Sequence, residues 1–276
     1  MLTATLLALA AAGLHAGWNF LIKTGEERGV AAWAQFTFGA VLGLPVLLVV
    51  GLPGWEALPY LAASGLVHVV YVVALVRSYG HGDFGVAYPL ARGSGALLAA
   101  VGGVVLLGDH LTAWSWVAIG VVLVGITLLV GRSVTGPTIA WALATGVTIG
   151  IYTLIDADGA RRTDGLPYGL TVIWATALCL AAYNAARGRV SLIRAAVRRS
   201  WRRFLVAGAC TTAAYTLVLI AVRSAPVGYV ATLRESSVVL AALLGWLVLK
   251  EPLGERRTAA AAVMTAGLIL LVVSRT

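Results

Sequence analysis

The sequence predicts an all-α polytopic membrane protein in which ten transmembrane helices form two inverted five-helix repeats. The first observation is composition: 60% of the 276 residues are hydrophobic, only 11% are charged, and the mean hydropathy is +0.93. A soluble domain carries about 25% charged residues. The second is that apolar residues fall in runs of about 20, the length that spans a hydrocarbon core. The third is a long apolar stretch containing an arginine, which recurs later in the chain.

The net charge of +9 and the isoelectric point near 10.1 do not indicate nucleic-acid binding. Seven of the 20 basic residues lie in a single connection, 187–203. Attraction to anionic headgroups and control of membrane topology explain such a cluster better. We therefore expect a lipid bilayer, and no nucleic acid, as a partner.

Ten helices are expected, separated by short breaks where glycine, proline and charged residues cluster. Their ranges are 2–23, 31–50, 58–78, 84–107, 112–130, 138–156, 167–186, 203–223, 227–249 and 257–273. The first is interpreted as a membrane helix and not a signal peptide, because no basic residue precedes it and its apolar run is long. Fourteen of the 20 basic residues lie in loops after odd-numbered helices, which places those loops in the cytoplasm and both termini outside.

The helix expected at 84–107 is the clearest sign of a repeat. Pro89 lacks a backbone donor and is expected to interrupt this helix near its start, and Arg92 is a costly residue inside a bilayer. One constant shift along the sequence aligns the pairs Arg92 and Arg234, Ser94 and Ser236, Leu98 and Leu240, Asp109 and Glu251, and Gly125 and Gly267. The repeats are assigned to 1–131 and 138–274. Because five is an odd number, they cross the bilayer in opposite directions, and inverted repeats of this kind build transporters.

Matching polar stripes on the first and sixth helices extend the repeat, at a slightly smaller shift. Residues four apart lie on one helix face, and the two stripes are His15, Asn19 and Lys23, and Thr148, Tyr152 and Asp156. Both helices also contain a GxxxG motif, at Gly13 and Gly17 and at Gly146 and Gly150, which permits close helix approach. The stripes are interpreted as the lining of a cavity, with interhelical hydrogen bonding as the alternative.

Two interpretations stay open for Arg92 and Arg234, since an arginine in a bilayer needs a carboxylate, backbone carbonyls or water. One is a buried ion pair that locks the halves together. The other is a clamp for a substrate carboxylate, with Glu235 binding an amine or a proton. Neighbouring aromatic side chains would complete a substrate site, although each could instead serve packing or the interfacial belt. The predicted substrate-binding residues are His15, Trp18, Asn19, His68, Tyr71, Tyr88, Arg92, Tyr152, Tyr215, Arg234 and Glu235.

Enzyme signatures are missing from the sequence. It contains no Walker A loop, GxSxG or HExxH motif, and Asp156 is not matched by a second aspartate of an intramembrane protease. Its four histidines lack metal-binding spacing. We expect no catalytic residues, metal or cofactor, and a small-molecule substrate; a monomer is compatible with the sequence.

The final hundred residues, including SAPVGYVATLRESSVVLAALLGWLVLKEPLGERRTAAAAVMTAGLILLV, resemble the second EamA repeat of the drug/metabolite transporter superfamily. Glu251 and the Gly267 helix carry this likeness. The first half is similar, with Asp109 in place of the usual glutamate, and so are the HAGWN and IYTLIDADGAR stretches. Length and layout resemble the YddG-type amino-acid exporters. That resemblance implies export of amino acids and related metabolites across the bacterial inner membrane, and a cavity lined by helices 1, 3, 4, 6, 8 and 9.

Together these features predict a secondary transporter that works by alternating access. Proton coupling through Glu235 or His15 and facilitated diffusion are both compatible with the sequence. Alternative cargoes are lipophilic cations, sugars and nucleotide-linked metabolites. A membrane-embedded enzyme or a structural subunit of a larger complex is a further alternative.

Overall fold

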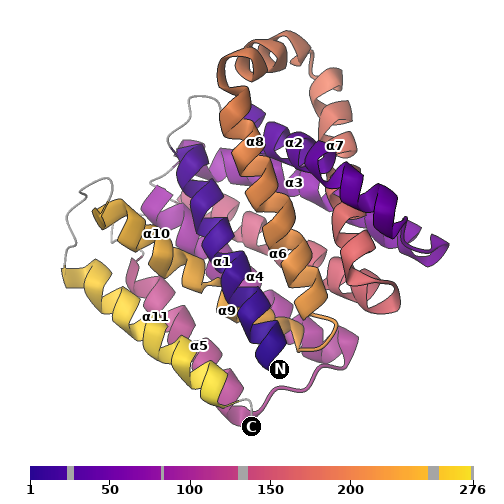
Figure 1. Ribbon diagram of the computed structural model, residues 1–276. Coiled ribbons are helices and arrows are strands. Elements are labelled where there is room, and N and C mark those ends of the chain that lie inside the picture. Colours follow the sequence, from indigo (N-terminus) through magenta and orange to yellow (C-terminus); the bar gives the residue numbers. More distant parts are fainter. Residues whose placement is uncertain (24–27, 82–83, 130–135, 248–254, 275–276) are drawn as a thin grey trace.

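The structure, a computed structural model, describes residues 1–23, 28–81, 84–129, 136–247 and 255–274, in which every regular element is a helix. The elements are α1 (Leu2–Lys23), α2 (Arg28–Val50), η1 (Trp55–Ala57), α3 (Leu58–His81), α4 (Phe84–Leu107), α5 (Ala113–Leu129), α6 (Gly136–Arg162), α7 (Gly165–Ala186), α8 (Val190–Ala221), α9 (Val227–Arg234), α10 (Ser236–Leu247) and α11 (Glu255–Val273). They form one bundle (Figure 1).

The helices have the composition of membrane-spanning segments. By length and composition, six of those described can cross a membrane: Gly29–Val50, Trp55–Ser78, Leu90–Leu107, Gly136–Arg162, Gly165–Ala186 and Val190–Ala221. Leu2–Trp18, Ala113–Leu128 and Thr258–Val273 are shorter apolar helices. The predicted all-α membrane fold is confirmed at this level, and the count of ten spans stays a prediction.

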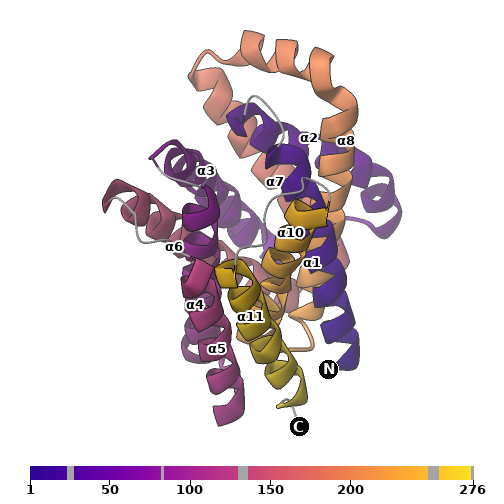
Figure 2. The same cartoon turned by 90° about the vertical axis from the view of Figure 1, so that its left-hand side faces the viewer.

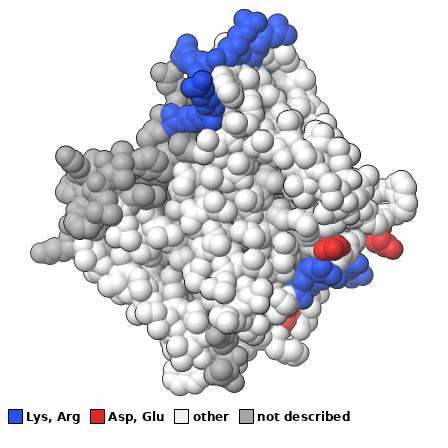
Figure 3. Space-filling model, viewed as in Figure 1, with Lys and Arg blue, Asp and Glu red and all other residues white. Residues whose placement is uncertain are grey.

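Polar and apolar side chains are distributed as a bilayer requires. Large apolar side chains face outward, with Val49 86% and Val105 72% exposed, while Arg92, Asp156 and Glu235 are buried. On the face drawn in Figure 3, arginines gather at the upper end, charges of both signs lie at the lower right, and the described surface between them carries no charged residues. An apolar belt between charged ends suits a hydrocarbon core.

The basic segment, which we define as residues 187–203, is helical from Val190 onward, where the sequence predicted a connection. α8 begins at Val190 and bends at Ser200, where the backbone leaves the helical region (φ −131, ψ 22). The first part of α8 turns across the upper end of the bundle, and both termini lie at the opposite end (Figures 1 and 2). The bend lays the arginine-rich part across the end of the bundle, whereas a straight α8 would project away from it.

The helix predicted at 227–249 is divided into α9 and α10, whereas the helix predicted at 84–107, which contains Pro89, is continuous. The Glu235 amide donates to the Thr232 carbonyl (3.0 Å), and the Val238 amide donates to the Glu235 carbonyl (2.9 Å). These three-residue bonds tighten the chain and separate α9 from α10. The interruption predicted at Pro89 is wrong, because α4 runs through this residue from Phe84. Pro89 lies in the second turn, where little helix precedes it.

The two GxxxG motifs differ in what surrounds them. A Cβ on Gly146 would meet the Ala91 carbonyl oxygen at 2.9 Å, and one on Gly150 would meet the Leu98 Cβ at 2.7 Å. The motif on α6 therefore lets α4 and α6 pack closely, a pairing that the sequence did not identify. A Cβ on Gly13 would meet nothing within 4 Å, and Gly17 is equally open. The α1 motif permits a close approach that no described helix makes at these two glycines.

Candidate functional site

The two buried charges Arg92 and Glu235 form an ion pair that joins α4 to the α9–α10 junction. Arg92 Nη2 lies 2.7 Å from Glu235 Oε1, and the two side chains are 7% and 3% exposed. The carboxylate comes from the later part of the chain and the guanidinium from the earlier part. The ion-pair interpretation therefore holds for Arg92, whose partner the sequence did not identify.

Arg234 lies one residue away and is buried without such a contact. Its Nε has no hydrogen-bond partner among the described residues, and the same is true of Glu235 Oε2. Neighbouring residues on a helix point in different directions, so Arg234 does not share the carboxylate that Arg92 holds. Arg92 acts electrostatically on Arg234 as a second positive charge. The junction thus presents an unsatisfied guanidinium nitrogen and an unsatisfied carboxylate oxygen from adjacent residues.

The predicted residues on α1 lie beside this junction. Trp18 Nε1 donates to His15 Nδ1 (3.2 Å), and the two rings meet edge to face with centroids 4.9 Å apart. Both arginines, Arg92 and Arg234, act electrostatically on His15. The Asn19 side chain, also predicted to line the site, lies outside the described residues.

Four more predicted residues form a ring cluster, which we define as His68, Tyr71, Tyr152 and Tyr215. His68 stacks on Tyr152 with centroids 4.1 Å apart, and the rings of Tyr71 and Tyr215 each lie 6.0 Å from His68. The rings come from α3, α6 and α8, so only tertiary packing brings them together. The side chain of Tyr88 lies outside the described residues.

Tyr152 connects the ring cluster to the charged junction. Arg234, Arg92, Asp156 and Glu235 all act electrostatically on this side chain. One tyrosine on α6 is therefore near both arginines and both buried carboxylates. This arrangement can bind a ligand whose charged head meets the junction and whose apolar part meets the rings.

Asp156, absent from the predicted site residues, lies at the centre of a hydrogen-bond network. It is fully buried and accepts hydrogen bonds from Ser64 Oγ (2.9 Å), Tyr168 Oη (2.9 Å) and Tyr215 Oη. Its position in the polar stripe with Tyr152 was the signal that could have identified it. The number of its partners could not be predicted, because they come from α3, α7 and α8.

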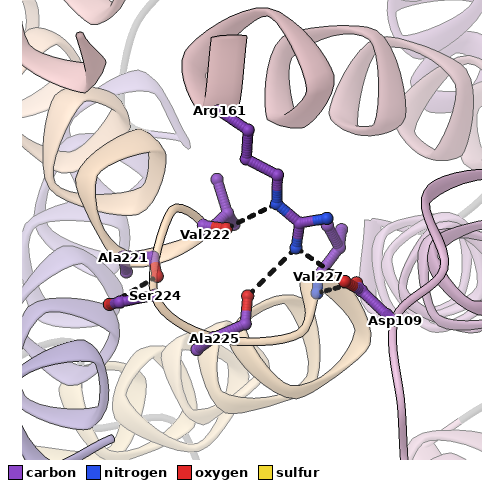
Figure 4. Close-up of polar contacts among 7 residues, drawn as sticks. All are labelled: Asp109, Arg161, Ala221, Val222, Ser224, Ala225 and Val227. Atoms are coloured by element: carbon purple, nitrogen blue, oxygen red, sulfur yellow. Dashed lines mark hydrogen bonds and ion pairs between the residues drawn. The ribbon is translucent and has the colours of Figure 1, made fainter. Parts of the chain in front are cut away.

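A second polar cluster closes one end of the bundle (Figure 4). Arg161 Nη2 lies 2.8 Å from Asp109 Oδ1, and its guanidinium donates to the carbonyls of Val222 (2.7 Å, from Nε) and Ala225 (3.2 Å, from Nη2). Asp109 Oδ2 accepts from the Val227 amide (2.6 Å), where α9 begins and a negative charge is favourable. We call this group the terminal clasp; it lies at the end of α8 opposite the basic segment.

Residues 136–273, half of the chain, match the EamA-like transporter family. The chain belongs to this family. A solved structure described only as "Crystal structure of protein" has a TM-score of 0.75 and 17% sequence identity, and the match covers 98% of each chain. That likeness shows a shared fold over nearly the whole chain, beyond the half that the family match covers. No curated protein matches.

Membership of the EamA family establishes the general class of this protein. The family consists of transporters of the drug/metabolite type, which implies a membrane location and a small-molecule substrate. Among the described residues, no group of three or more histidine, cysteine or acidic side chains could hold a metal ion.

Proposed function

We propose that this EamA transporter is a secondary carrier that exports amino acids and related small metabolites across the bacterial inner membrane by alternating access. The observation that carries the proposal is Arg234, a buried guanidinium that forms no ion pair among the described residues and whose Nε has no hydrogen-bond partner there. A buried charge without a partner is costly. A substrate carboxylate would satisfy it, and arginine can bind a carboxylate in bidentate fashion.

The charged head of an amino acid fits the junction between α9 and α10. Its carboxylate and ammonium groups are attached to the same carbon, so the two protein charges that bind them must lie in one region. Glu235 acts electrostatically on Arg234, and both act on Tyr152. Glu235 Oε2 is the carboxylate oxygen left unsatisfied by Arg92. We place the substrate carboxylate at Arg234 and the ammonium group at this oxygen. Interrupted membrane helices commonly form substrate sites of this kind.

The proposed repeat explains why Arg234 and not Arg92 is available. The shift that aligns Arg92 with Arg234 also aligns Gly93 with Glu235. The carboxylate that neutralises Arg92 therefore has a glycine as its counterpart, and Arg234 receives no matching carboxylate. This asymmetry leaves one positive charge for the substrate.

The ring cluster supplies apolar surface for the substrate side chain. Tyr152 and Tyr215 both lie within the electrostatic influence of Arg234, so a ligand held there can reach the rings. Aromatic faces contribute large contact areas while their polar groups stay hydrogen-bonded. Trp18 and His15 border the junction from α1, and Asn19 and Tyr88 remain proposed site residues.

Contacts between α5 and α11 support the assignment of two repeats to 1–131 and 138–274. A Cβ on Gly125 would meet the Met264 amide nitrogen at 2.9 Å, and one on Gly267 would meet the Val122 amide nitrogen at 2.9 Å. The same shift that aligns Gly125 with Gly267 aligns Val122 with Met264, so it converts each contact into the other. Such reciprocity is typical of a pseudo-two-fold axis, which inverted repeats require.

The experiment that tests this function is counterflow in proteoliposomes. Vesicles containing the protein and an excess of an unlabelled amino acid are compared with empty vesicles for uptake of each member of a radiolabelled amino-acid panel. Saturable uptake that unlabelled substrate inhibits is the expected result, and Arg234→Lys should weaken it. If folded, inserted protein takes up no amino acid, this cargo is excluded, and organic cations, sugars and nucleotide-linked metabolites are tested in the same vesicles.

A further inference from the structure

The buried carboxylate of Asp156 has no positive partner. Its contacts are the hydroxyl groups of Ser64, Tyr168 and Tyr215, and among the described residues no basic side chain forms an ion pair with it. A charge buried in this way must be paired or neutralised. Glu235 differs, because Arg92 already neutralises it at 2.7 Å.

We propose that Asp156 is a proton-binding site of this transporter, which loads and releases a proton during the transport cycle. The proposal rests on the transport function proposed above. It replaces Glu235 and His15, the candidates suggested by the sequence, with a carboxylate that binds no substrate group in our assignment.

The partners of Asp156 suit both of its protonation states. A hydroxyl group can donate a hydrogen bond to a carboxylate and, after rotation, accept one from a carboxylic acid. Ser64, Tyr168 and Tyr215 are all of this type, whereas an arginine can only donate and would favour the charged form. A site that must alternate between two states requires partners of this kind.

Hydrogen bonds also connect Asp156 to the ring cluster. Ser64 Oγ donates to Asp156 Oδ2 and lies 3.2 Å from His68 Nδ1, and His68 stacks on Tyr152. Tyr215 contacts Asp156 directly and belongs to the same cluster. A substrate side chain bound among the rings would therefore touch groups that hold the proton site.

The titratable and charged groups around this site lie on α6 itself and on the helices packed against it. His68 lies on α3, Tyr168 on α7, Tyr215 on α8 and Tyr152 on α6 itself, while Arg92, Arg234 and Glu235 reach Tyr152 from α4 and the α9–α10 junction. Tyr60 and Asp158 act on Tyr168 from its other side. Among the described residues, neither arginine forms an ion pair with Asp156, so a bound proton is what would neutralise this carboxylate.

The first test needs no substrate. Infrared difference spectra of the reconstituted protein between acidic and alkaline pH should contain the carbonyl stretch of a protonated carboxyl group. We expect this band to disappear in Asp156→Asn, to shift in Tyr168→Phe, which removes one donor, and to persist in Asp158→Asn, whose carboxylate pairs with Arg162 near the helix end (2.9 Å). A wild-type protein without the band, or a band that Asp156→Asn leaves unchanged, would overturn the proposal.

The second test measures coupling with radiolabelled phenylalanine as the probe. We take the ratio of two rates measured in the same vesicle preparation: uptake driven by a pH gradient, and counterflow. In Asp156→Asn this ratio should fall to the value found without a gradient. A merely structural Asp156 would lower both rates and leave the ratio unchanged, which overturns the proposal, as does undiminished coupling. If wild-type protein transports no amino acid, the function proposed above fails, and the infrared result still decides the proton site.

Discussion

At the scale of single residues, Arg92 and Arg234 have different environments despite equivalent places in the proposed repeat. Arg92 is neutralised by Glu235 at 2.7 Å, whereas Arg234 forms no ion pair among the described residues. Removing one member of a buried ion pair leaves the other charge uncompensated. Removing Arg234, which pairs with no carboxylate among the described residues, leaves no uncompensated charge behind. The first arginine should therefore matter for folding and the second for transport.

We predict that Arg92→Ala fails to accumulate, because breaking a buried ion pair costs about 3–5 kcal/mol. Arg234→Ala should accumulate normally but bind substrate about ten- to a hundredfold more weakly, the equivalent of one lost charged hydrogen bond. Fluorescence-detected size-exclusion chromatography measures accumulation, and counterflow measures binding. The double variant Arg92→Leu/Glu235→Leu serves as the control, since it leaves neither charge buried and should accumulate again. If the Arg234→Ala protein does not accumulate in folded form, the assignment of Arg234 to transport is wrong.

At the scale of helices, small residues decide which pairs approach closely. α4 and α6 meet where Gly146 faces the Ala91 carbonyl and Gly150 faces Leu98. This contact brings Arg92 of α4 within electrostatic reach of Tyr152 of α6. The ring cluster, to which Tyr152 belongs, therefore lies near the charged junction. The identical motif on α1 has open space around its glycines. A GxxxG spacing therefore permits close packing without producing it.

A matched pair of substitutions tests this difference. Gly146→Ala should lower thermal stability, because its Cβ would contact the Ala91 carbonyl oxygen at 2.9 Å and overpacking costs about 1–3 kcal/mol. Gly13→Ala should leave the unfolding midpoint unchanged or raise it slightly, since alanine favours a helix more than glycine. The midpoints are measured in detergent by loss of monodisperse protein on heating. Equal destabilisation by both substitutions would show that Gly13 is in close contact with another helix and not in open space.

At the scale of the whole molecule, the terminal clasp closes one end of the bundle. Asp109 and Arg161 connect the chain after α4, the end of α6 and the turn between α8 and α9. Both chain termini lie at this end (Figure 1). The proposed orientation, with the basic segment in the cytoplasm, places the clasp on the outer side. Alternating access would require the clasp to separate when the carrier opens outward.

We predict that Asp109→Asn opens this end more often. Loss of the charge removes the ion pair with Arg161 (2.8 Å), and a change of about 1–2 kcal/mol shifts an equilibrium by about five- to thirtyfold. A cysteine at the buried Ala225, with the free Cys179 and Cys210 replaced by alanine, should react correspondingly faster with a membrane-impermeant maleimide.

The control for this measurement is Arg162→Ala, which breaks the exposed pair with Asp158 on the same helix. It should leave labelling at Ala225 unchanged, because exposed pairs contribute little. Unaltered labelling in Asp109→Asn would show that the clasp does not hold this end closed.

Composition and periodicity were sufficient to predict the helical membrane fold, the two helices with buried arginines and most of the helix bounds. They also identified the rings of His68, Tyr71, Tyr152 and Tyr215, which the structure brings together. These features depend on local sequence, because runs of apolar residues and turn residues determine where helices begin and end.

Only the tertiary structure decided which charges meet. The partner of Arg92 is 143 positions away, the three donors to Asp156 come from three other helices, and the chain divides at Glu235 and not at Pro89. Spacing along one helix shows which residues share a face but not which helix lies opposite. Pairing across a bundle depends on the approach of helices distant in the sequence, so the sequence proposed candidates for the site and the packing selected among them.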